Sequence, residues 1–207
     1  MRFKGLIAGV VLLLFMGCSS TMKYTWTKDG FSGKHYEKIL IVALTDNQES
    51  RTTFENTMVK DLEEQGIVAE NSMTLLPPFK NAKRPSESEI HELIVNNGFD
   101  AVIVSSLLDV ESQEVFEYND NMYNPVYYRH GRYIYSHYNY MSNSGYYKEE
   151  KSYVIESRLF DVSAKSKEDA VVWSGQSTLT DPTSYYSASR QYAKRLAKTL
   201  IENKIIN

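Results

Sequence analysis

Apolar residues in the first half of the chain occur in short unbroken runs, separated by stretches in which they recur every three or four positions. Residues 39–44 and 101–104 are runs of strand length, which indicates strands that are covered on both faces. Residues 67–69 form a shorter run of the same kind. The pattern therefore predicts three strands in this half of the chain.

Two helices are predicted between these strands. Thr52 and Glu55 have the spacing of a capping box at the start of the first helix, and Ser86 and Glu89 repeat it at the start of the second. Glycines at positions 66 and 98 are placed where each helix would end. The apolar faces directed at the sheet would consist of Phe54, Met58 and Leu62 in the first helix, and of Ile90, Leu93 and Ile94 in the second.

The second half of the chain changes character. Residues 153–162 and 170–179 predict two strands, joined by a charged loop at 163–169. A turn at 181–183 leads into a last helix. We therefore expect an α+β domain over residues 35–207, a mixed sheet with helices packed on it, in the order β-α-β-α-β, then a β-hairpin and a C-terminal helix. The apolar stripe of that helix would be Tyr185, Ala188, Tyr192, Leu196 and Leu200.

An N-terminal segment of a different kind precedes this domain. Two cations are followed by the apolar run 6–16, which is too short to span a bilayer because a spanning helix needs about 20 residues. This pattern is typical of a secretion signal. Residues 12–18, Leu-Leu-Leu-Phe-Met-Gly-Cys, resemble the lipobox of bacterial lipoproteins, with Phe15 where that box usually has Leu. The resemblance implies that residues 1–17 are removed and that Cys18 is lipidated. The alternative is a buried thiol at the end of a retained anchor.

The segment after Cys18 is interpreted as a tether. Residues 19–34 are polar with two glycines, and a flexible coil of this length spans about 20–24 Å. Serines follow the cysteine, with no aspartate at the position that retains many such lipoproteins in the inner membrane. The resemblance therefore implies an outer-membrane protein that faces the periplasm and holds the membrane through its lipid.

Composition and motifs exclude several kinds of partner. Removal of residues 1–17 would leave 190 residues (207 − 17) with 21 basic and 26 acidic side chains, and no basic run to neutralise phosphates. We expect no nucleic-acid partner, and no nucleotide either, because the chain has no Walker loop and no G-x-G-x-x-G. A single cysteine excludes an internal disulfide and multi-cysteine metal sites. No cofactor and no metal are expected.

The order of the elements, with Asp161 followed by Val-Trp-Ser-Gly at residues 172–175, resembles a group of small envelope lipoproteins. The group includes activators of penicillin-binding proteins, the curli-secretion lipoprotein and the N-terminal domain of TolB. The likeness covers residues 36–203, and it implies a shared fold and the binding of proteins rather than of a substrate. The chain departs from the group by a tyrosine-rich insertion at 118–147.

This insertion is the predicted partner-binding surface. It holds ten of the sixteen tyrosines, and from residue 121 to 147 its only formal charges are Arg129 and Arg132. Tyrosine offers large contact area with a polar tip, and it is favoured at binding surfaces together with arginine. We select Arg132, Tyr133 and Tyr135, because residues 133–138 alternate as a strand does. Two alternatives remain: a hairpin that packs on the domain, and a segment without fixed structure.

The sequence contains no strong catalytic pattern. His130 and His137 form the only nearby histidine pair, whereas a metal needs three or four ligands. Asp109, Glu111, Glu114 and Glu117 could serve as the carboxylates of a hydrolase acting on cell-wall glycan, or they could solvate one face of an extended segment. The leading prediction is a non-enzymatic, protein-binding accessory module of the cell envelope. The alternatives are that glycan-acting enzyme and a permanent structural subunit of an envelope complex.

The lipobox gives a direct prediction for Cys18. Because the thiol would carry the lipid, Cys18→Ala should give an uncleaved or released protein without lipid. Mass spectrometry of the membrane fraction measures this, and an unmodified Cys18 there would contradict the assignment.

Overall fold

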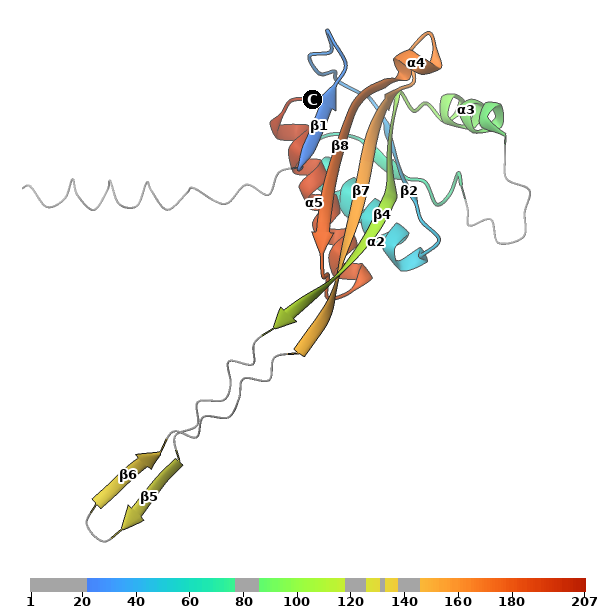
Figure 1. Cartoon of the computed structure of the whole chain (residues 1–207). Coiled ribbons are helices and arrows are strands. Elements are labelled where there is room, and N and C mark those ends of the chain that lie inside the picture. Colours follow the sequence, from blue (N-terminus) through green and yellow to red (C-terminus); the bar gives the residue numbers. More distant parts are fainter. Residues whose placement is uncertain (1–21, 77–85, 118–125, 131–132, 138–145) are drawn as a thin grey trace, which may run out of the picture.

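The computed structural model describes residues 22–76, 86–117, 126–130, 133–137 and 146–207 (Figure 1). Its centre is a six-stranded sheet with the strand order β1-β8-β7-β4-β2-β3. Strand β2 is parallel to β3 and β4, and the other neighbours are antiparallel. The predicted α+β class with a mixed sheet is confirmed. The strands are β1 (Tyr24–Thr27), β2 (Ile39–Leu44), β3 (Ala69–Asn71), β4 (Ala101–Glu117), β7 (Tyr146–Asp161) and β8 (Val171–Thr180).

Two long helices cover one face of the sheet. Helices α2 (Gln48–Glu63) and α5 (Tyr185–Glu202) lie side by side on it (Figure 1), and the rings of Phe54 and Tyr192 stack between them at 5.8 Å. Leu62, Leu196 and Leu200 are fully buried there. The shorter helices are α3 (Glu87–Asn96) and α4 (Lys167–Ala170). No helix in the described ranges is both long and apolar enough to cross a membrane.

The opposite face of the sheet is covered only in part. Leu40, Val42, Phe99 and Val102 form a second buried cluster, against which Ile94 of α3 packs. Strand β2 is therefore buried on both faces, as its apolar run predicts. Over β7, β8 and β1 this face carries exposed side chains, namely Arg158, Tyr24 and Trp26.

The start of α2 differs from the prediction. The helix begins at Gln48, and its cap is Asn47, whose side chain accepts a hydrogen bond from the Ser50 N–H at 2.8 Å. The predicted capping box at Thr52 and Glu55 is wrong, because the earlier cap places both residues inside the helix. The capping box of Ser86 and Glu89 at the start of α3 is confirmed, with both of its hydrogen bonds present.

The ends of several strands also differ from the prediction. The short second strand of the prediction is β3, Ala69–Asn71, rather than residues 67–69. Strand β4 continues well past residue 104, and β7 begins at Tyr146 rather than at 153. Tyr146 and Tyr147, which were assigned to the insertion, therefore belong to β7. In the last helix, Tyr192 and the two leucines after it are buried as predicted, but Tyr185 is exposed.

Part of the predicted tether is folded. Met22 is buried in the main core, and β1 pairs with β8 from Tyr24↔Gln176 to Thr27↔Trp173. Lys34 forms a bridge to Ile206 near the C-terminus. The polar composition of this stretch suggested a coil, but the aromatic and β-branched residues at 24–27 favour a strand once a sheet edge is available. The folded part thus begins upstream of residue 35, and residues 1–21 lie outside the described chain.

The Trp-Ser-Gly sequence has a packing role. Trp173 is 1% exposed. A Cβ at Gly175 would collide with its indole ring. Glycine at position 175 therefore leaves room for the indole ring of Trp173, which packs against its backbone.

Burial on both faces of β2 gives a testable contrast within one strand. Ile41 is fully buried and Leu44 is 59% exposed. Ile41→Ala should lower the free energy of unfolding by about 2–5 kcal/mol through lost contacts and a cavity. Leu44→Ala should change it by no more than about 0.5 kcal/mol. Urea denaturation measures both, and equal effects would show that β2 is not buried on both faces.

Candidate interaction surface

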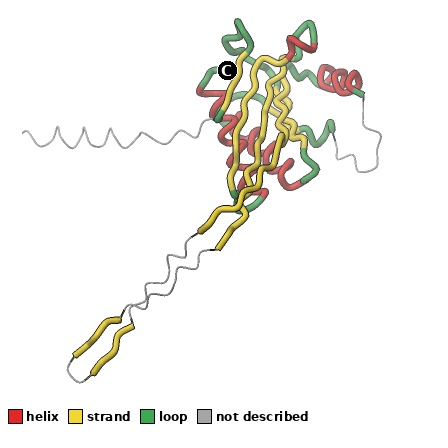
Figure 2. Tube along the Cα trace, in the orientation of Figure 1, coloured by secondary structure: helices red, strands yellow, loops and turns green. Residues whose placement is uncertain are grey.

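Strands β4 and β7 extend past all their neighbours (Figure 2). Strand β2 pairs with β4 only as far as Ser106, and β8 pairs with β7 only as far as Ser152. Residues 112–117 of β4 and 146–151 of β7 continue to pair with each other, out to Glu117↔Tyr146. We call these two stretches the ribbon. The ribbon leads directly into the tyrosine-rich insertion.

A bulge marks the base of the ribbon. The β4–β7 register shifts between Leu107 and Asp109, so that Leu107 faces Ile155 and Asp109 faces Val154. The extra residue, Leu108, has no partner in the β7 register, and about half of it is exposed. Such a bulge bends the strand and increases its twist. It also changes which β4 side chains share a face before and after it.

Apolar side chains are exposed at the bulge and at the outer end of the ribbon. The rings of Phe116 and Tyr147 meet edge to face at 5.1 Å, and Tyr147 is 72% exposed. In the β4–β7 register, Phe116 and Tyr147 share a face with Leu107 and Val110, polar residues lie between the two pairs, and Val115 projects from the other face. The exposed apolar residues of β4 and β7 between the bulge and the end of the ribbon, which we call the apolar strip, are Leu107, Leu108, Val110, Val115, Phe116 and Tyr147.

A cavity of about 550 Å³ opens at the inner end of the apolar strip. Leu107 and Val110 form one wall, Tyr153 and Ile155 of β7 a second, and the first turns of α5 close it. The cavity lies at the carboxyl end of the parallel strands β2 and β4, a usual place for binding sites in sheets with parallel strands. Its lining is mainly apolar, so it suits an apolar side chain better than a charged one.

Hydroxyl groups of residues in and next to the cavity wall form a short chain of hydrogen bonds. The hydroxyl oxygens of Ser105 and Ser157 lie 2.5 Å apart, and that of Ser157 lies 2.7 Å from the phenol oxygen of Tyr192. Burial raises the pKa of the Tyr192 phenol above its ordinary value, so the group stays protonated at neutral pH. These hydroxyls satisfy one another, and we assign them a role in joining β4, β7 and α5.

The ribbon is braced where it leaves the sheet. Lys148 pairs with the carboxylate of Asp181, which lies in the turn between β8 and α5. The Asp181 N–H donates to the Lys151 carbonyl at 2.8 Å, and Asp181 has a positive φ of 44°. These contacts connect one strand of the ribbon to the start of α5.

The carboxylates after the bulge are divided between the two faces of β4, with Asp109 and Glu111 on one face and Glu114 on the other. Asp109, Glu111 and Glu114 are all exposed. Glu111 and Glu114 lie three positions apart in a continuous ladder, so they point to opposite faces of β4. The side chain of Glu117 is outside the described set. Within the described ranges, no group of three or more histidine, cysteine or acidic residues could hold a metal ion.

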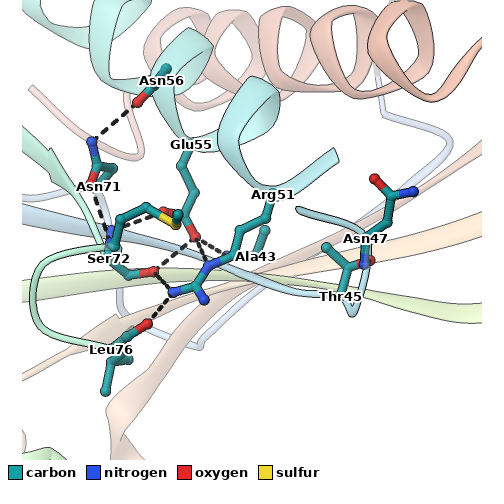
Figure 3. Close-up of polar contacts among 10 residues, drawn as sticks. Ala43, Thr45, Asn47, Arg51, Glu55, Asn56, Asn71, Ser72 and Leu76 are labelled. Carbon is teal, nitrogen blue, oxygen red and sulfur yellow. Dashed lines mark hydrogen bonds and ion pairs between the residues drawn. The ribbon is translucent and has the colours of Figure 1, made fainter. Parts of the chain in front are cut away.

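A buried ion pair in α2 was missed by sequence reading (Figure 3). Glu55 Oε1 accepts hydrogen bonds from the Ala43 N–H at 2.9 Å, from Arg51 Nε at 3.1 Å and from the Ser72 hydroxyl at 2.8 Å. Its other oxygen accepts from the Ser72 N–H at 2.9 Å. Arg51 also donates to the Leu76 carbonyl at 2.6 Å. Both side chains are fully engaged in joining α2 to β2 and to the turn after β3.

The residues predicted to bind a partner are placed only in part. Tyr133 and Tyr135 belong to β6 (Tyr133–His137), which pairs with β5 (Val126–His130) in a separate two-stranded sheet. The predicted strand in this stretch is thus confirmed in its backbone. Arg132 and Cys18 lie outside the described residues, as do the side chains of the two tyrosines.

The histidine pair is separated by the register of this small sheet. His130 pairs with Tyr133 at one end of the ladder, and His137 pairs with Val126 at the other. Four positions along a strand correspond to about 14 Å. The backbone therefore does not bring the two histidines together.

The apolar strip was also missed, although a signal for it existed. Leu107 and Leu108 follow directly on the third predicted strand, and Val110, Val115 and Phe116 are interspersed with acids. The adjacent residues Leu107 and Leu108 interrupt the alternation of apolar and polar positions in a strand. This interruption is the sequence signal of the bulge. Whether such residues are covered depends on the length of the neighbouring strands.

No protein-family model matches the sequence, and no curated protein does. Several solved structures are similar. A PelC dodecamer from Paraburkholderia phytofirmans has 14% identity and a TM-score of 0.43, over 87% of this chain and 96% of that one. Lipoprotein GNA1162 from Neisseria meningitidis has 13% identity and a TM-score of 0.40, over 80% and 98%. A minor lipoprotein from Acinetobacter baumannii has 8% identity and a TM-score of 0.34, over 82% and 95%. Bacterial lipoproteins are therefore among the solved structures whose backbone resembles that of this chain.

The Arg51–Glu55 pair predicts a large effect from the loss of one charge. Arg51→Met should lower the free energy of unfolding by about 3–5 kcal/mol, because it leaves a buried carboxylate without its cation. The matched control is Lys60→Met, which removes a cation from an exposed i,i+4 pair with Glu64 in the same helix. That change should cost less than about 0.5 kcal/mol. Denaturant unfolding compares them, and a similar small effect for both would contradict a buried, fully engaged pair.

Proposed function

We propose that this protein is a lipid-anchored lipoprotein of the outer membrane, facing the periplasm, that binds another envelope protein without catalysing a reaction. The lipobox at Cys18 supports the anchor. The observation that carries the binding role is the apolar strip, which exposes apolar side chains at the bulge and at the outer end of the ribbon, next to the tyrosine-rich insertion.

The energetics of the ribbon favour a covered state. A two-stranded ladder is only marginally stable by itself in water. The ribbon has no third strand within the described ranges, and Val115, Phe116 and Tyr147 are 37%, 39% and 72% exposed. A partner that packs on these side chains would bury apolar area and would stabilise the ladder at the same time. An envelope protein is the partner that the predicted location makes available.

The absence of catalysis is part of the proposal and has its own support. The exposed acids after the bulge are divided between the two faces of β4, with Asp109 and Glu111 on one face and Glu114 on the other. The buried Glu55 has all its bonds made to groups that hold the fold. A binding role needs neither set of carboxylates. Release of soluble fragments from purified sacculi, lost on substitution of Asp109 or Glu111, would instead favour the glycan-acting enzyme.

The selected insertion residues provide the main test. Replacing Arg132, Tyr133 and Tyr135 together by Ala should abolish partner capture in crosslinking pull-downs from intact cells, because interface energy is concentrated in a few aromatic and arginine anchors. Thermal unfolding should stay nearly unchanged, since the buried core lies in other segments. The measurements are quantitative mass spectrometry of the captured proteins and a melting curve.

A matched control uses a tyrosine outside the insertion. Tyr186→Ala removes one exposed tyrosine of α5 that is not among the residues lining the cavity, and the partner should still be captured. Normal capture by the triple variant would place the binding surface elsewhere. A large fall in its melting temperature would favour a hairpin that packs on the domain.

A further inference from the structure

Strand β1 presents two aromatic side chains to solvent at the edge of the sheet. Tyr24 is 62% exposed and Trp26 is 51% exposed. They are two positions apart in a strand, so they project from the same face. Their cross-strand partners in β8 are Gln176 and Ser174, which give no apolar cover. Within the described chain, β1 has a neighbouring strand on one side only.

The position of this pair in the chain places it near the lipid. Met22 is buried in the main core, so the fold holds the chain from that residue onwards. Cys18 lies only four positions before Met22 (22 − 18). Even a fully extended chain of that length spans no more than about 14 Å. A lipid on Cys18 would therefore keep the β1 edge within a short distance of the bilayer surface.

We propose that Tyr24 and Trp26 contact the membrane at the level of the lipid headgroups and so fix the orientation of the domain on it. This inference rests on the lipidation of Cys18 in the proposed function. Tyrosine and tryptophan are favoured at this depth because their rings are apolar and their polar groups still reach water. Lys23, whose Nζ lies 5.4 Å from the centre of the Tyr24 ring, adds a cation suited to anionic headgroups.

The same edge could instead pair with a second copy of the chain, since an edge strand offers free backbone groups. Two observations favour the membrane. Strand β1 has only four residues, which gives a short ladder. The anchor also places lipid next to this edge at all times, whereas a second copy is available only at a sufficient concentration.

The two tryptophans of the chain make the contact measurable. Trp173 is 1% exposed, so Trp26 is the tryptophan that lipid can reach. The lipidated protein is reconstituted into vesicles of phosphatidylethanolamine and phosphatidylglycerol whose acyl chains carry bromine near the glycerol end. We expect loss of Trp26 emission in these vesicles and a shift of the remaining emission to shorter wavelength. Trp26→Phe should remove the quenched component and leave the Trp173 signal unchanged.

A reporter on another surface provides the control. In the Trp26→Phe background, Tyr147→Trp places an exposed tryptophan on the ribbon. This reporter should not be quenched by brominated lipid, because it lies far along β7 from the β1 edge. Quenching of both reporters to the same extent would show random collision with the bilayer and would overturn the proposal.

The remaining outcomes separate the contact from the anchor. Lipidated, vesicle-bound protein whose Trp26 is open to aqueous acrylamide but not to brominated lipid overturns the contact and leaves the anchor intact. Protection of Trp26 from both quenchers, increasing with protein concentration, identifies a second copy as the occupant and also overturns it. An unmodified Cys18 in mass spectrometry overturns the anchor and, with it, the premise of the contact.

Discussion

The antiparallel ladder between β4 and β7 is the interaction on which the rest of the structure depends. It joins the parallel strands β2 and β3 to the antiparallel strands β8 and β1. Its inner rows, from Ala101↔Asp161, lie in the core under α2 and α5, and its outer rows form the ribbon. One continuous pairing therefore builds the core and extends the surface that we propose for binding.

The parts of the fold that could be predicted are those that local sequence determines. The apolar run at 39–44 is long enough to specify a strand covered on both faces, and the capping box at Ser86 is contained within four residues. The stripe of Tyr192, Leu196 and Leu200 has helical spacing and is buried. In each case the residues that form the sequence pattern are the same residues that form the structural element.

The parts that could not be predicted depend on partners far along the chain. Strand β1 exists because β8, about 150 residues later, offers it an edge. Glu55 has the spacing of a capping residue, but its role is set by Ser72 and by Ala43, and neither is apparent from the helix pattern. The candidate site shows the same limit. Tyrosine content identified the insertion, whereas the apolar strip became visible only once the lengths of β2 and β8 were known.

The paired geometry of the ribbon has a consequence for how its reach can vary. Beyond Lys148 and Lys151, which are held to Asp181, residues 146–147 pair only with residues 116–117, so paired residues can be added or removed there without disturbing the sheet beneath. One residue added to each strand would lengthen the ribbon by about 3.4 Å and turn its end to the other face, whereas two in each strand would restore the face. Adding or removing two residues in each strand would therefore change the length of the ribbon but keep the same side chains on the same face.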